Sequence, residues 1–336
     1  MRNTKRILLS HGSGGKLTHD LIQGLLLKKL RNPILEKLSD SAYLGYRQGL
    51  AFTTDSFVIS PIEFPGGDIG KLSVCGTVND LAVSAAVPEY LSLALIIEEG
   101  FGYSALEKII DSVASTASAA GVRVVTGDVK VVERGACDKI FITTCGIGRL
   151  LDNRRLSVAQ IRPTDKIIIT GTIAQHGLAV LASRKGLALG RGIRSDCACL
   201  HDLLLPLFSH TAAIRCMRDP TRGGLATLLN EIADASGLGM HIEEKRIPIA
   251  GQVRAACELL GIDPLYLASE GRAVLFVAAD AAEKVVRLLR RHPLGARARV
   301  IGSVAAEAPR RVVLHTGLGS RRIIEMLIGE PLPRIC

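Results

Sequence analysis

The chain has 336 residues, of which 48% are hydrophobic and 4% aromatic, and it contains no Trp. That length and apolar content allow two domains whose cores are built from aliphatic side chains. The formal charge of +10 admits anionic partners, but Lys and Arg are scattered and few aromatics are available to stack on bases, so we expect no nucleic-acid binding. Without a signal peptide or an apolar run long enough for a membrane span, we expect a cytoplasmic protein that has no membrane segment and keeps its cysteines reduced.

The chain alternates strand-like and helix-like segments. In the first half, strands are expected at 50–54, 90–98, 122–126 and 139–146, and helices at 70–86 and 104–120. Ser104 and Glu107 form a capping-box pattern at the start of the second helix. Further strands are expected at 166–170, 271–278 and 311–314, with a helix that ends near Gly237. The pattern indicates two α/β halves, with domains at 1–152 and 153–329 and a mobile tail at 330–336, and it leaves the strand order open.

Two local motifs are excluded by their spacing. Gly12–Lys16 is not a Walker A loop, because Ser10 and Leu17 stand where that motif needs Gly and Ser or Thr. The Gly12–Gly15 cluster can still cradle phosphates through its backbone N–H groups, or it can be a simple turn. Cys197 and Cys199, with His201 nearby, lack the second ligand pair of a zinc site, so no structural metal is expected there.

Acidic residues recur beside Gly or Thr near the ends of expected strands and helices. They are Asp55, Asp80 with Asn79 before it, Asp128 and Asp219. Oxygen ligands gathered from several elements suit Mg²⁺, and Gly-rich turns or helix N-termini supply N–H donors for phosphates. The cations able to balance phosphate charge are Lys71, Lys130 and Arg222. Each acid alone is typical of a turn or cap, but together they favour an ATP–Mg²⁺ site.

The chain ends in Pro331–Cys336, with a thiol as its last side chain. Its two prolines restrict the backbone, and six residues can span about 20 Å. A thiol on such an arm can carry an acyl-type group as a thioester-like adduct. A frayed end that carries a cysteine by chance is the alternative.

Seven segments, in chain order, are similar to those of the HypE family of hydrogenase maturation proteins. They are 11–15, 53–57, 64–70, 76–81, 126–132, 219–225 and 333–336. That family is related to aminoimidazole ribonucleotide synthetase, selenophosphate synthetase and thiamine monophosphate kinase, which use ATP and are typically dimers with the nucleotide near the subunit interface. The resemblance implies an α/β fold of the α+β type, with two domains, mixed sheets flanked by helices and a flexible C-terminal tail.

The resemblance also implies a reaction. Cys336 would accept a carbamoyl group from the carbamoyltransferase HypF, and an ATP-dependent dehydration would turn the thiocarboxamide into a thiocyanate. The cyanide would pass to iron on the HypC–HypD complex, for nickel–iron hydrogenases. A homodimer is expected.

The implied site residues fall into three groups. The Mg²⁺ ligands would be Asp40, Asp55, Asp80 and Asp219. The nucleotide pocket would add Gly12, Gly14, Gly15, Lys71, Asn79, Thr126, Gly127, Asp128 and Arg222. Lys130 and Glu270 would move protons. Val129 departs from the family pattern, which more often shows Thr there, and this weakens any hydroxyl contact at that position.

Two other functions stay open at this point. One is a different enzyme of the same superfamily, such as a small-molecule phosphotransferase. A selenophosphate synthetase would be expected to carry a reactive Cys or selenocysteine near the N-terminal glycines, where this chain has Ser13. The other is a non-catalytic scaffold or basic binding protein, which would show no nucleotide affinity.

Overall fold

The computed structural model describes residues 16–21, 23–24, 35–38, 42–44, 49–187, 192–327 and 334–336. The predicted Gly12–Gly15 cluster and Asp40 lie outside these ranges, as does the approach to the tail at 328–333. In the described ranges no helix combines the length and the apolarity needed to cross a bilayer.

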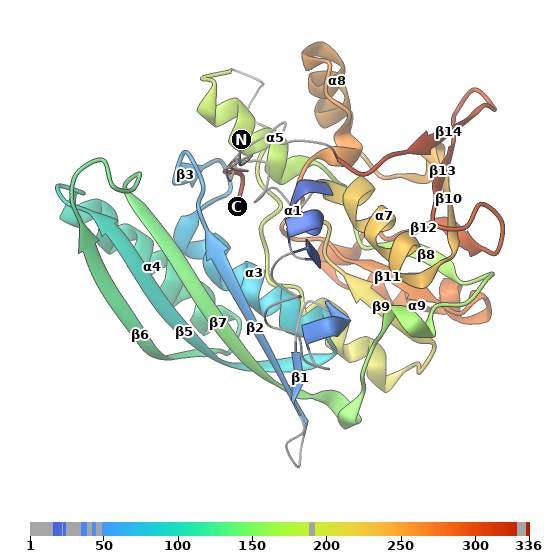
Figure 1. Cartoon of the computed structure of the whole chain (residues 1–336), viewed down its shortest axis with the longest axis horizontal. Helices are drawn as coiled ribbons and strands as arrows, with labels where there is room; N and C mark the ends of the chain where they lie inside the picture. The colour runs from blue at the N-terminus through green and yellow to red at the C-terminus, as the bar shows by residue number, and fades with distance from the viewer. Residues whose placement is uncertain are drawn as a thin grey trace, which may run out of the picture.

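The first half is built on a mixed five-stranded sheet. Its strand order is β1 (Ala42–Leu44), β2 (Leu50–Phe57), β7 (Ile140–Leu150), β5 (Ala86–Glu98) and β6 (Arg123–Val132). Only the β5–β6 pair is parallel. The helices that the structure describes in this half are α1 (Lys16–Leu21), α3 (Ile69–Val83) and α4 (Tyr103–Ala119). Figure 1 shows α3 and α4 packed on one side of this sheet, with β6 at its outer edge.

Helix α3 is buried on almost every side because its residues are small. Gly76 lies against the ring of Phe57, where a Cβ atom would clash, and Ser73, Cys75 and Thr77 are also buried. The helix begins where the side chain of Asp68 accepts a hydrogen bond from the backbone N of Lys71 at 2.8 Å. Small residues therefore let α3 pass between its own sheet and the second half.

The second half is built on a mixed seven-stranded sheet. Its strand order is β14 (Arg321–Ile324), β13 (Val312–His315), β10 (Gly239–Glu243), β12 (Arg299–Ala305), β8 (Lys166–Ile169), β11 (Val274–Val277) and β9 (Ile214–Arg218). Its helices are α5 (Gln175–Arg184), α6 (His201–Leu204), α7 (Gly224–Ser236), α8 (Gly251–Leu260) and α9 (Ala282–Leu289). A short hairpin, β3 (Glu63–Phe64) with β4 (Gly67–Asp68), precedes α3.

Both faces of the second sheet are covered. Along β8, Ile167 and Ile169 pack with residues of α5, α7 and α8, whereas Ile168 packs with residues of α6 and α9. A strand buried on both faces reads as a continuous apolar run, as β8 does. The predicted class, mixed sheets flanked by helices, is confirmed.

Several predicted boundaries are wrong. β2 runs on to Phe57, so Asp55 lies inside it instead of ending it. β6 keeps pairing with β5 as far as Val132, so Gly127 and Asp128 lie inside that strand and do not follow it. The capping box at Ser104 is absent, because α4 begins at Tyr103 after Gly102 with no side-chain cap. The sequence patterns also gave no strand for β9, β10, β12 or β14.

The last three residues are docked against the fold. The backbone N of Val58 donates to the Cys336 carbonyl at 3.1 Å, and that of Ser60 donates to the Arg334 carbonyl at 3.2 Å. Ile335 is buried in a cluster that contains Phe64. The last residues therefore lie alongside the segment that follows β2, between the two halves (Figure 1).

Candidate active site

The terminal thiol lies in a polar site inside the fold. Nε of Arg222 donates to Sγ of Cys336 at 3.1 Å. Cys336 and its contact with Arg222 are partly exposed to solvent, although many protein atoms lie around the thiol. Burial raises the pKa of Cys336 to about 11 against the opposing effect of Arg222, with Glu270 and Asp55 raising it further. The docked thiol is therefore protonated at neutral pH.

His176 on α5 holds the tail through its backbone. One ring nitrogen, Nε2, lies 2.8 Å from the Ile335 carbonyl, and the other, Nδ1, lies 2.8 Å from Oγ of Ser195. A carbonyl can only accept, so Nε2 carries the proton and Nδ1 accepts from the serine hydroxyl. Burial lowers the pKa of His176, which keeps the ring neutral in that tautomer.

Arg184 and Asp138 hold Arg334, the residue before Ile335, through its backbone and its side chain. Arg184 donates to the Arg334 carbonyl at 2.6 Å, and the Arg334 guanidinium pairs with Asp138 at 2.7 Å. These contacts, with those of His176, come from residues that the sequence patterns did not single out. A lone histidine or arginine in an α-helix carries no local signal for such a role, because its partner lies at the far end of the chain.

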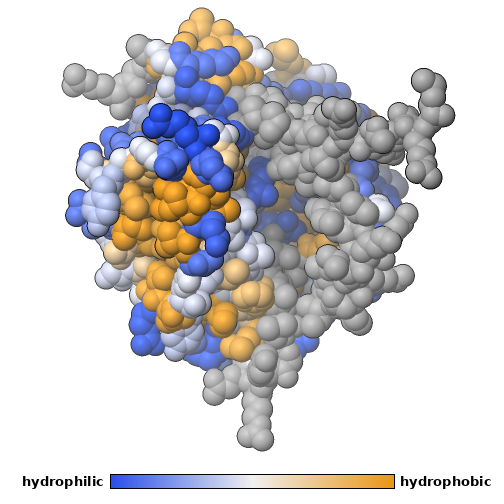
Figure 2. Space-filling view, turned by 60° about the vertical axis from the view of Figure 1, so that its left-hand side comes forward, coloured by the Kyte–Doolittle hydropathy of each residue, from blue (hydrophilic) through white to orange (hydrophobic). Residues whose placement is uncertain are grey.

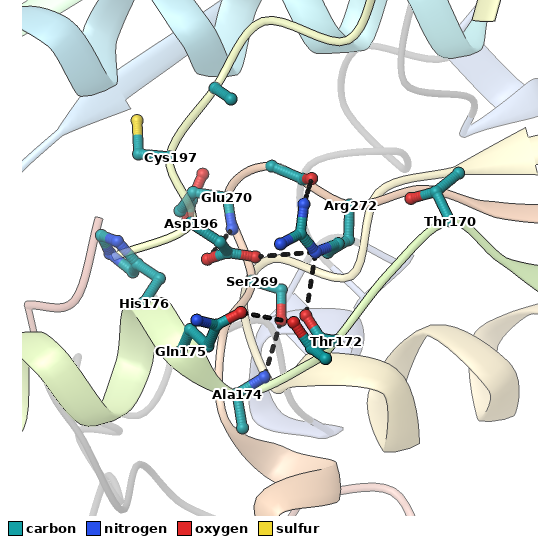
Figure 3. Close-up of polar contacts among 12 residues, drawn as sticks. Thr170, Thr172, Ala174, Gln175, His176, Asp196, Cys197, Ser269, Glu270 and Arg272 are labelled. Carbon is teal, nitrogen blue, oxygen red and sulfur yellow. Dashed lines mark hydrogen bonds and ion pairs between the residues drawn. The ribbon is translucent and has the colours of Figure 1, made fainter. Parts of the chain in front are cut away.

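Glu270 is the buried acid of the site. It is 2% exposed, and its Oε1 has no hydrogen-bond partner among the described residues. Its backbone N donates to Oδ1 of Asp196 at 3.3 Å, while Oδ2 of Asp196 lies 3.6 Å from Nε of Arg272 (Figure 3). Burial first, then the nearby charges of Asp219 and Asp196, raise the pKa of Glu270 well above its usual range. Glu270 is therefore a proton-holding group with a free oxygen.

Asp55 and Asp80 form a carboxylate pair next to this acid. Thr77 donates to Asp55 at 3.1 Å, and Thr53 donates to Asp80 at 2.7 Å. Burial raises the pKa of Asp55, although Arg222 and hydrogen bonds from Thr77 and Asp80 oppose it. A divalent cation would offset that burial, so the donor chemistry of the pair fits Mg²⁺.

The full set of four metal ligands stays a prediction. Across the described ranges, no three His, Cys, Asp or Glu side chains are gathered closely enough to hold an ion. Asp40 lies outside those ranges. Asp219 begins the turn before α7, where Gly223 and Gly224 adopt positive φ angles, and its charge acts on Glu270.

The predicted residues of β6 are not brought to this site within one chain. Asp55, Thr144, Leu93 and Gly127 follow one another across β2, β7, β5 and β6, so three strand spacings, about 14 Å, separate Asp55 from Gly127. Thr126, Asp128 and Lys130 share one face of this edge strand and are exposed. Gly127 itself passes so close to the Leu93 carbonyl that a Cβ atom would clash.

Two other predicted nucleotide residues make structural contacts. The amide of Asn79 donates to the carbonyls of Ala198 at 3.0 Å and Glu270 at 3.1 Å and accepts from Leu200 N at 2.8 Å. Lys71 donates to the Gly66 carbonyl at 3.0 Å. Asn79 thus joins the two halves. The contact with a nucleotide that the sequence predicts for Asn79 stays a prediction.

Comparisons with known proteins show which family this chain resembles. Residues 38–150 match the family model described as AIR synthase related protein, N-terminal domain, and residues 162–315 match the corresponding C-terminal domain. Carbamoyl dehydratase HypE of Rhodobacter capsulatus is 48% identical over 335 residues, which cover 99% of this chain and 98% of that protein. The chain belongs to the HypE family. The resemblance found in the sequence motifs is therefore confirmed over nearly the whole chain.

Solved HypE structures have the same fold. The structure of a HypE–HypF complex superposes with a TM-score of 0.87 at 43% identity, covering 91% of this chain and 99% of that one. HypE in complex with ATP superposes with a TM-score of 0.83 at 46% identity, covering 98% and 100%. The first of these structures pairs a HypE with a protein partner, and the second pairs a HypE with a nucleotide.

Proposed function

We propose that this chain is an ATP-dependent carbamoyl dehydratase that acts on a carbamoyl group carried by its own Cys336. The product would be a thiocyanate, which supplies the cyanide ligand for the iron of nickel–iron hydrogenases. One observation carries the proposal: the last side chain of the chain is docked inside the fold, bonded to Arg222 and within the field of Glu270 and Asp55.

The residues around the thiol suit the chemistry of a dehydration. An amide oxygen is a poor leaving group, so ATP would phosphorylate it and phosphate would leave as the C≡N bond forms. Two protons must leave the nitrogen, and Glu270, whose raised pKa makes it a good base once it has given up its own proton, would accept one. Arg222, beside the sulfur, can stabilise charge that develops on the phosphorylated group.

The nucleotide and its metal would use the carboxylates beside Glu270. Asp55 and Asp80 would hold Mg²⁺, with Asp40 and Asp219 as further candidate ligands. Bound Mg²⁺ would neutralise phosphate charge during phosphoryl transfer. The buried, protonated state of the docked thiol also supports loading elsewhere, because a thiolate is the better nucleophile and Cys336 regains its ordinary pKa only outside the site.

The partners follow from this division of labour. The carbamoyl donor would be HypF, and the solved complex of a related HypE with HypF supports this choice. The cyanide acceptor would be the HypC–HypD complex. Each would meet the tail when Arg334–Cys336 leaves its docked position.

A homodimer would complete the site. Within the described part of the chain, β6 is an edge strand that pairs with β5 alone, and it exposes Val125 at 59% and Val131 at 62%. A broad apolar area faces the reader in Figure 2, on the side where Figure 1 places β6. Apolar area of this size on an unpaired edge favours association with a second copy. Burial of β6 in such a dimer would place Thr126–Lys130 beside the partner, near the position expected for the nucleotide.

Mass spectrometry of the tail tests the function. The chain is incubated with HypF, its carbamoyl donor and ATP–Mg²⁺, and the C-terminal peptide is then weighed. We expect a carbamoyl adduct on Cys336 that loses the mass of one water only when ATP is present. Cys336→Ala should abolish the adduct while leaving ATP binding intact. An adduct that ATP leaves unchanged would refute the proposal.

A further inference from the structure

Three cysteines from distant parts of the sequence meet where the two halves touch. Cys75 lies on α3, and Cys197 and Cys199 lie on the extended segment at 195–200. Sγ of Cys199 is 3.5 Å from Sγ of Cys75, and the Cys197 thiol is within interaction range of Cys75 as well. Figure 3 shows Cys197 beside Asp196 and His176, so the thiols border the site that holds the tail.

Solvent can reach this cluster through one of the three cysteines. A cavity of about 380 Å³ is lined by all three cysteines together with Lys71 and His201, among others. Cys199 is partly exposed there, whereas Cys75 and Cys197 are buried. An accessible thiol next to a buried one is the arrangement in which the first reacts and the second resolves the product.

The electrostatics divide these two roles. A hydrogen bond from Cys75 lowers the pKa of Cys199, and the charge of Lys71 lowers it further, against the opposing effect of burial. The same hydrogen bonding to Cys197 and Cys199, followed by burial, raises the pKa of Cys75. Cys199 is therefore the more acidic thiol of the pair. A metal does not explain the cluster, because no three ligand side chains within the described part of the chain are arranged to hold one.

We propose that Cys75 and Cys199 are a redox-active dithiol, oxidised to a disulfide by low-molecular-weight disulfides such as glutathione disulfide. The Cys199 thiolate attacks one sulfur of the oxidant, forming a mixed disulfide and releasing one thiolate. Cys75 then gives up its proton and attacks Sγ of Cys199, which releases the second thiolate. Two protein thiols are oxidised, and one small disulfide is reduced to two thiols.

The Cys75–Cys199 disulfide needs little movement to form, and it would join the segment at 195–200 to helix α3. The sulfur atoms must approach from 3.5 Å to about 2.05 Å. The segment at 195–200 also carries Ser195, which holds His176, which in turn holds the Ile335 carbonyl. A disulfide to α3 would therefore restrain one wall of the tail site. This inference does not depend on the reaction proposed for Cys336.

Disulfide mapping in a Cys336→Ser background tests the proposal, because the tail thiol then cannot compete. The folded protein is incubated with glutathione disulfide, free thiols are trapped with N-ethylmaleimide, and the peptides are mapped by mass spectrometry. We expect the Cys75 peptide to be linked to the peptide that carries Cys199. The link should persist in Cys197→Ser and form at least about tenfold more slowly in Cys199→Ser.

Two results would overturn it. One is stable glutathionylation of Cys199 without any link to Cys75. The other is a link that forms as fast in Cys199→Ser as in the parent, which would assign the chemistry to Cys197. Thermal melting gives an independent readout: residues 124 positions apart become joined, so the oxidised form should melt several degrees higher, whereas an equal or lower Tm would contradict a pre-arranged pair.

Discussion

Glu270 is the residue on which the proposed chemistry depends most. Its burial and unpaired Oε1 make it a strong base once ionised. Glu270→Gln keeps the shape and removes the titration, so dehydration of the carbamoylated tail should fall by about 100-fold or more while carbamoylation of Cys336 continues. Mass spectrometry of the C-terminal peptide separates the two steps. Glu258→Gln, on an exposed position of α8, is the control and should change neither.

Glu270→Gln should lower the activity but raise the stability of the folded chain at high pH. The pKa of Glu270 lies well above its ordinary value of 4.5 in the folded state, so above pH 4.5 the folded chain holds a proton that the unfolded chain releases. Stability from this group is therefore present below pH 4.5 and is lost as pH rises. Glu270→Gln should melt at a higher temperature than the parent at pH 8, with no advantage at pH 4. An advantage that grows toward low pH would contradict the assigned environment.

Cys336 predicts a pH dependence for docking of the tail. Its pKa rises from 9.0 to about 11 on docking, mainly through burial, so the docked state prefers the protonated thiol. Docking should be constant below pH 9 and weaken by up to about tenfold per pH unit between 9 and 11. The measurement is the alkylation rate of a free peptide of the last six residues divided by that of Cys336 in a variant whose other cysteines are Ser. A ratio that stays flat or rises above pH 9 would refute this.

Among the strands whose burial the structure describes, β6 is the most exposed to solvent. Val129 and Val131 share one face of the strand and are exposed, and Val125, at a register shift near the start of the strand, is exposed as well. If this face forms the dimer, a charge there is buried without a partner, and Val131→Lys should weaken dimerisation by about 100-fold. For Val131→Lys, light scattering after size-exclusion chromatography should give the mass of one chain, whereas the parent should give the mass of two. Leu318→Lys, at a loop position that is 98% exposed, is the control and should stay dimeric.

Particular helices and strands show how much of the fold the sequence predicts. Leu225, Leu228 and Ile232 predict α7 because their spacing matches one buried helix face, and the structure confirms it. β9, β10, β12 and β14 escape notice because Arg, His or Gly interrupts the apolar run in each of them, whereas the equally short β8, β11 and β13 are nearly continuous apolar runs. Asp55 and Cys336 are visible as residue types, but the contact between the tail and His176 joins positions 159 apart, which no local pattern encodes.

At the scale of the whole molecule, Asn79 is a buried polar link between the two halves. It is 1% exposed, and its side chain bonds three backbone groups of the second half. Asn79→Ala would leave the carbonyls of Ala198 and Glu270 and the N–H of Leu200 without this partner, so unfolding should become easier by about 3 kcal/mol. Asn79 holds the backbone of Glu270 and the segment at 195–200, which carries Cys197 and Cys199. Its loss should therefore also loosen the site that binds the tail.

Urea unfolding and alkylation of Cys336 measure the two effects together. Asn230→Ala is the matched control, because the amide of Asn230 also donates to two carbonyls, those of Ala226 and Ile324, but both lie within the second half. We expect Asn79→Ala to lose more stability than Asn230→Ala and, unlike it, to speed alkylation of the docked thiol. Equal losses with unchanged thiol reactivity would mean that the other contacts between the halves, such as that of Arg184 with the Ser60 carbonyl, are enough to hold them, and that the tail site does not depend on Asn79.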